Sequence, residues 1–160
     1  MKTPISNIVV AVTGTDASIL AAKYGIVMAR LYHCKLTAVY VVDTETIRQL
    51  TLSKIFIQEE STEYEKSLEV NGERYLSFVE ELAHAKGVKV ERILRKGAVY
   101  TELLKAADEC EADLILIGGW EKDRKTRDIF GHSHREIMIN AKCSVTLVKE
   151  PEIDRIYRQL

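Results

Sequence analysis

Five short runs of mainly apolar residues recur along the chain, and longer stretches with helical spacing separate most of them. The runs at residues 7–13 (NIVVAVT) and 113–117 (DLILI) show little alternation of polar and apolar positions. Such runs are typical of strands whose two faces are both covered, as in a parallel sheet. The five predicted strands span residues 7–13, 35–42, 88–95, 113–117 and 144–149.

Four stretches between these strands carry apolar residues at the 3.6-residue spacing of amphipathic helices. The predicted helices span residues 17–33, 58–86, 99–109 and 132–141. Thr15 or Asp16 can cap the start of the first. Residues 43–57 mix polar and apolar positions without a clear period, so they fit a loop and a short helix about equally.

The second predicted helix carries a glycine, Gly72, on its apolar stripe. Glycine in a helix interior costs about 1 kcal/mol relative to alanine. Its place on the stripe therefore suggests close packing against the sheet. Gly87 fits the left-handed residue that ends such a helix.

Strands that alternate with helices predict a doubly wound α/β fold: a five-stranded, mainly parallel sheet with helices on both faces. Such folds bind ligands at the carboxyl ends of the strands, where the strand order reverses. We expect one domain over residues 1–150 and a C-terminal tail over residues 151–160. The apolar residues of the tail either fold back onto the domain or pack on a partner.

Composition excludes several classes of protein. The formal net charge of −1 argues against a general nucleic-acid binder, and no apolar run reaches the length of a membrane span. The first residues lack the apolar run of a signal peptide, so a cytoplasmic location is expected. Cys34, Cys110 and Cys143 form no CxxC pair, which predicts reduced thiols without a metal site. His132 and His134 would face different sides of a helix, a poor arrangement for chelation.

Candidate chemistry concentrates in residues 112–148, where a strand, a charged loop, a helix and a strand are expected. Gly118 and Gly131 stand at the two ends of the loop, and Gly131 is predicted to open the helix. The first N–H groups of a helix lack intrahelical partners and carry a partial positive charge. A glycine there lets an anion approach the backbone, so this segment can hold a phosphate.

The segments IVVAVTGTDAS, KGAVYTELLKAADECEADLILIGG and NAKCSVTLVKE carry a family resemblance. With them, the chain resembles the universal stress protein family over nearly its whole length. The resemblance implies an adenine-nucleotide α-hydrolase-like fold. It also implies a homodimer that pairs through the C-terminal strand, Ser144–Lys149, and an unpaired sheet edge favours such pairing independently.

Nucleotide-binding members of that family carry Gly, two residues, Gly, nine residues, then Gly followed by Ser or Thr. Gly118 and Gly131 match the first and third glycines of this signature. Glu121 stands in place of the second glycine, and His132 in place of the hydroxyl residue. Thr13 ends the first strand where binding members have an aspartate that helps recognise adenine and ribose.

These departures weaken the predicted site. A carboxylate at Glu121 about 4 Å from a phosphate charge costs about 4 kcal/mol at an effective dielectric of 20. His132 can still donate a hydrogen bond, and Ser133 offers a hydroxyl one position late. The basic residues between Glu121 and Gly131 could neutralise an anion, or form a solvated loop of mixed charge; they are Lys122, Arg124, Lys125 and Arg127.

The resemblance makes one set of residues the candidate site for ATP or AMP with magnesium. Backbone contacts to the nucleotide are implied at Ala11, Val12 and Val41, and such contacts survive side-chain changes. Trp120 fits a residue that stacks on a base or a partner, or one that covers the sheet edge. The full candidate set is Ala11, Val12, Thr13, Val41, Ile117, Gly118, Gly119, Glu121, Gly131, His132 and Ser133.

The resemblance and the departures together predict a dimeric binding or regulatory protein of the stress response, with weak or lost ATP binding and no enzymatic activity. The alternative is an ATP- or AMP-dependent switch or slow ATPase that uses Gly118, Gly131, His132 and Ser133. A third reading is a scaffold that binds a protein partner through Trp120 and the tail. No GxSxG or other catalytic constellation can be argued from the spacing.

Overall fold

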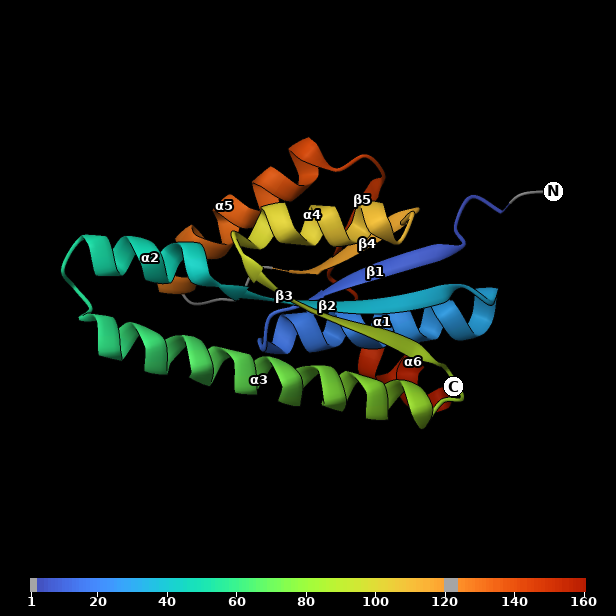
Figure 1. Ribbon diagram of the computed structural model, residues 1–160. Coiled ribbons are helices and arrows are strands. Elements are labelled where there is room, and N and C mark those ends of the chain that lie inside the picture. The colour runs from blue at the N-terminus through green and yellow to red at the C-terminus, as the bar shows by residue number, and fades with distance from the viewer. Residues whose placement is uncertain (1–2, 120–123) are drawn as a thin grey trace.

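The sheet is parallel and has the strand order β3-β2-β1-β4-β5, with helices on both of its faces (Figure 1). The computed structural model describes residues 3–119 and 124–160, and the side chains of 3–119 and 132–160. The elements, in chain order, are β1 (Asn7–Val12), α1 (Asp16–Tyr32), β2 (Lys35–Asp43), α2 (Thr44–Leu52), α3 (Gln58–His84), β3 (Val90–Gly97), α4 (Val99–Glu109), β4 (Leu114–Gly118), α5 (Arg124–Asn140), β5 (Ser144–Val148) and α6 (Ile153–Gln159).

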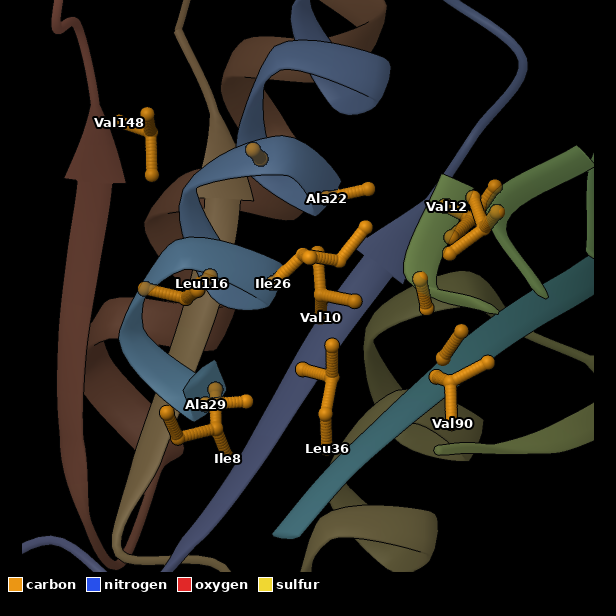
Figure 2. Packing of buried hydrophobic residues seen from close by; sticks show 14 of the residues in the cluster. Ile8, Val10, Val12, Ala22, Ile26, Ala29, Leu36, Val90, Leu116 and Val148 are labelled. Carbon is orange, nitrogen blue, oxygen red and sulfur yellow. The ribbon is translucent and has the colours of Figure 1, made fainter. Parts of the chain in front are cut away.

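Two apolar cores lie on the two faces of the sheet. On one face, α1, α3 and α6 cover β1, β2 and β4, and Val10, Ile26 and Leu116 meet there (Figure 2). On the other face, α4 and α5 pack on the same strands around Val9 and Leu103. Figure 1 shows α4 and α5 above the sheet and α1 and α3 below it. The predicted α/β class is confirmed.

Most predicted elements form within two residues of their expected bounds, and the helix over residues 99–109 matches at both ends. Thr15 caps α1, because its hydroxyl accepts from the Ser18 amide at 3.1 Å. Residues 43–57, which fitted loop and helix equally, form α2 and a turn. Asp43 caps α2 by accepting from the Thr46 amide at 3.0 Å.

One predicted boundary is wrong. The last long helix was expected over residues 132–141 with Gly131 as its opening residue, but α5 begins at Arg124. Arginine and lysine are good helix formers, and a glycine in a helix interior costs only about 1 kcal/mol. Residues 124–130, which precede Gly131, are therefore part of the helix.

Close packing explains the glycine in the longest helix. A Cβ on Gly72 would lie 2.5 Å from Cδ1 of Tyr40 and 3.1 Å from a methyl of Leu94, so α3 approaches β2 and β3 only because that atom is absent. The prediction for Gly72 is confirmed. Gly87 has φ +68°, the left-handed conformation expected after α3.

The C-terminal residues fold back onto the domain, one of the two alternatives that the sequence left open. Ile153 and Tyr157 of α6 are buried in the core that α1 and α3 share. The Tyr157 hydroxyl donates to the Leu82 carbonyl at 2.7 Å, and the Lys86 ammonium lies 4.8 Å from the Tyr157 ring centroid. The division into 1–150 and 151–160 stays a prediction.

Candidate functional site

The strand order places a topological switch point between β1 and β4. The chain runs outward from β1 through β2 to β3, and then returns to the other side of β1 as β4. At such a point the loops that follow the two neighbouring strands run in opposite directions, so they move apart and leave a crevice. Doubly wound folds bind their ligands in such a crevice. Val12 and Gly118, the last residues of β1 and β4, flank this point.

Hydroxyl groups hold the segment that follows β1. The Thr13 amide donates to Oγ of Ser18 at 3.1 Å, and the Thr13 and Thr15 hydroxyls lie 3.0 Å apart. Ser18 is buried and its hydroxyl also donates to the Thr15 carbonyl at 3.0 Å. Gly14 has φ +79°, and a Cβ there would lie 2.5 Å from the Tyr75 ring of α3. The exposed Thr13 side chain therefore projects from a well-ordered turn at the switch point.

Gly118 brings the end of β4 against the first turn of α1. A Cβ on Gly118 would lie 2.7 Å from the carbonyl carbon of Ala17 and 2.9 Å from the Ser18 amide nitrogen. Both atoms are backbone, so they cannot move aside as a flexible side chain can. The first glycine of the signature thus has a packing role, whether or not a phosphate binds beside it.

A histidine that the sequence did not single out as a site residue contacts the same glycine. Nε2 of His134, on α5, lies 2.7 Å from the Gly118 carbonyl oxygen, so His134 donates to it. This bond ties α5 to the end of β4. Spacing alone gives no sign of it, because the two residues meet only through the tertiary fold.

The remaining signature residues lie within or before α5. Gly131, His132 and Ser133 fall inside the helix, so their amides have the i−4 carbonyls as intrahelical partners. His132 is exposed, and its ring contacts Tyr100 edge to face with centroids 6.1 Å apart. Glu121 and Trp120 lie outside the described residues. A helix opening at Gly131, which the phosphate-site prediction needs, is not present.

The residues predicted to contact the adenine of a nucleotide lie at the ends of neighbouring strands. Val12 pairs in register with Tyr40, while Val41 lies one residue further along β2. Val12 and Ile117 are buried, and Ala11 and Val41 are half-buried beneath α4. Tyr40 stacks on Tyr75 with ring centroids 6.4 Å apart. Burial, followed by the nearby Tyr75 and Tyr64, raises the pKa of Tyr40, so its phenol stays neutral at physiological pH.

A cationic group at the same edge is already neutralised. Nζ of Lys96, at the end of β3, lies 2.8 Å from a Glu69 carboxylate oxygen and 3.4 Å from one of Glu65. Hydrogen bonding to Glu69 raises the pKa of Lys96 above its ordinary value. This lysine therefore offers little free charge to a phosphate.

Metal-ligating side chains and thiols are the groups that could serve other chemistry. Among the described residues, no three His, Cys, Asp or Glu side chains gather as a metal site would require. The three cysteines are half-buried free thiols, and burial raises the pKa of Cys34 and Cys143. No helix in the described part of the chain is long and apolar enough to cross a membrane.

Comparison with known proteins assigns the family. The family model described as the universal stress protein family matches residues 4–149. The chain belongs to the universal stress protein family. A universal stress protein of Methanocaldococcus jannaschii is 31% identical over 147 residues, which cover 91% of this chain and 83% of that one. The resemblance found in the sequence is therefore confirmed.

Solved structures of universal stress proteins share the fold. The protein UspA from Lactobacillus plantarum superposes with a TM-score of 0.76 at 19% identity, over 92% of this chain and 100% of that one. An Archaeoglobus fulgidus universal stress protein in complex with dAMP gives a TM-score of 0.62 at 20% identity, with coverage of 92% and 100%. At these identities the likeness concerns the fold alone.

Proposed function

We propose that this universal stress protein is a dimeric binding or regulatory protein of the stress response whose ATP binding is weak or lost. The observation that carries the proposal is the start of α5 at Arg124, seven residues before Gly131. A helix binds a phosphate through amides that lack intrahelical partners, and within a helix these lie only in the first turn. The amides of Gly131, His132 and Ser133 lie beyond that turn.

Two further features support weak binding. Nε2 of His134 donates a hydrogen bond to the Gly118 carbonyl oxygen at 2.7 Å, and this bond holds α5 against the end of β4. Thr13, which follows β1, has a hydroxyl and no carboxylate, and its backbone amide already donates a hydrogen bond to Oγ of Ser18. A neutral hydroxyl forms weaker hydrogen bonds to a ribose than a carboxylate does.

One observation favours the alternative of an adenine-nucleotide switch or slow ATPase. A structurally similar universal stress protein was solved in complex with dAMP, and Gly118 and Gly119 leave the end of β4 without side chains. In this alternative α5 must begin later when a nucleotide binds, so that the amides of Gly131 to Ser133 are released. Such remodelling lowers the apparent affinity, because part of the binding energy is used to shift the helix.

The proposal can be tested by asking whether a nucleotide stays bound to the protein through purification. We expect the purified protein, denatured and analysed by mass spectrometry, to release no stoichiometric adenine nucleotide. A bound AMP or ATP at about one per chain would contradict the proposal and favour the switch.

Glu121→Gly tests what weakens ATP binding. A sharp rise in ATP affinity would identify the Glu121 side chain as the obstacle to binding. No change in affinity would attribute the weak binding to Thr13 or to α5.

The dimer is proposed to form through β5. Among the described residues β5 pairs only with β4, so its outer edge is available to a second strand. Val145, Thr146 and Leu147 are half-buried within one chain. We expect light scattering at micromolar concentration to give about twice 18.2 kDa; a mass of one chain would refute pairing through this strand.

A further inference from the structure

The hairpin between α2 and α3 carries apolar side chains that the fold leaves in solvent. Leu52, Ile55, Ile57 and Tyr64 are 69%, 65%, 59% and 46% exposed. We call these four residues the hairpin patch. Exposed apolar side chains that gather at one place and are bordered by polar residues mark interaction sites, whereas scattered single ones do not.

The patch belongs to one ordered surface. The Phe56 and Tyr64 rings meet edge to face with centroids 5.6 Å apart, which brings the turn against the first part of α3. The Thr51 and Ser61 hydroxyls are hydrogen-bonded, and the amides of Ile55 and Phe56 both donate to the Leu50 carbonyl, at 3.0 and 3.2 Å. A surface held in this way loses little conformational entropy when a partner binds.

The inner side of the hairpin already serves the fold. Ile47 and Ser61 are buried, and α2 packs on α3. The apolar residues of the patch are on the outside, so they are not needed for the core. Figure 1 shows the hairpin reaching beyond the sheet at the end where α2 follows β2.

The charges beside the patch select the partner. Glu59, Glu60 and Glu63 are exposed at the start of α3, next to Ile57 and Tyr64 in the chain. None of these three glutamates forms an ion pair with a side chain that the structure describes. The neighbouring acids Glu45 and Glu65, by contrast, are paired with Arg48 and Lys96.

We propose that the hairpin patch binds a basic amphipathic helix of a partner protein. The apolar side chains of the partner helix would cover Leu52, Ile55, Ile57 and Tyr64. Its lysines or arginines would pair with Glu59, Glu60 and Glu63. Two exposed lysines lie near these glutamates, Lys54 in the turn and Lys66 one turn after Glu63, so acidic residues are in excess beside the patch. An apolar surface with an acidic rim recognises such helices through residues at i, i+3, i+4 and i+7. The inference goes beyond the proposed function and holds whether or not a nucleotide binds.

The probe is a fluorescent synthetic helix of about 18 residues, made only of leucine and lysine with leucine at i, i+3, i+4 and i+7. We expect the full chain to bind it saturably at one peptide per chain, and the affinity to fall as salt is raised. The matched peptide with glutamate in place of lysine should not bind. Equal binding of the two peptides, or none of either, would overturn the proposal.

Variants locate the site. Ile55→Ser with Ile57→Ser should weaken the leucine–lysine peptide by about tenfold or more, and Glu60→Lys with Glu63→Lys by a smaller, salt-dependent factor. Val70→Ser is the matched control, because Val70 is 56% exposed on α3 but lies outside the patch; it should bind as the parent does. All replaced side chains are exposed, so unchanged thermal unfolding is expected. An equal loss in Val70→Ser would refute the site.

Two other occupants are distinguished by the same variants. If the patch instead pairs with a second copy of the chain, Ile55→Ser with Ile57→Ser would convert a dimer to a monomer in light scattering. If it instead lies on a lipid surface, the parent would sediment with phosphatidylcholine vesicles and the variant would not. Either result would overturn the assignment to a partner helix.

Discussion

Replacing Gly118 with alanine is expected to lower the free energy of unfolding by about 2–3 kcal/mol. The new Cβ would lie 2.7 Å from the Ala17 carbonyl carbon and 2.8 Å from its oxygen, both in the backbone of α1. Either α1 or β4 must shift to accept the new Cβ, and both are packed in the core that α1, α3 and α6 form on one face of the sheet. Chemical denaturation measures the loss, which corresponds to a drop in Tm of about 5–10 °C for a domain of this size.

Gly87→Ala is the control for Gly118→Ala. A Cβ on Gly87 meets nothing within 4 Å, but its φ of +68° strains any other residue. The expected cost is about 1 kcal/mol, which is backbone strain without a steric clash. If Gly118→Ala proved no more destabilising than Gly87→Ala, the close approach of β4 to α1 would be refuted as the reason for glycine at position 118.

Replacing Ile153 with alanine is expected to destabilise the protein by about 2–4 kcal/mol. Ile153 is only 2% exposed, and it anchors α6 in the core beneath α1. The cavity left by the missing side chain cannot close without moving α6, which the Tyr157 bond to the Leu82 carbonyl holds in place. Thermal and chemical denaturation both report this loss.

Arg155→Ala is the matched control within the same helix. The Arg155 side chain is 65% exposed, and the one ion pair it forms with a described side chain is to Glu152, one turn away. Its loss should therefore change stability by less than about 0.5 kcal/mol. An Ile153→Ala protein as stable as Arg155→Ala would mean that α6 is not part of the folded core in solution. Residues 151–160 would then be available to a partner.

The alternating pattern of strands and helices was sufficient to predict the fold class. Fully apolar runs identified strands buried on both faces, such as β4, and Gly72 on an apolar stripe predicted the close contact that Tyr40 makes with α3. Family resemblance added the identity that the family match confirms. These features are local and periodic, so they can be recognised without knowledge of the tertiary structure.

The site was predicted less well, for physical reasons. Gly131 in the sequence predicts a helix start, but α5 begins at Arg124, because glycine is tolerated in a helix interior at a cost of about 1 kcal/mol. The bond from His134 to Gly118 joins residues on separate elements, so no spacing rule finds it. Asp43 as the cap of α2 was a usable signal: an aspartate followed by Thr-Glu-Thr fits a helix start.

The central claim is that this chain keeps the universal stress fold but binds adenine nucleotides weakly or not at all. Calorimetric titration of the full chain with ATP and magnesium, and separately with AMP, tests it most directly. We expect no saturable heat up to about 100 μM nucleotide, since the amides of Gly131 to Ser133 are engaged within α5. A dissociation constant near 1 μM, or about −8.2 kcal/mol, would contradict the claim and make the nucleotide switch the better account.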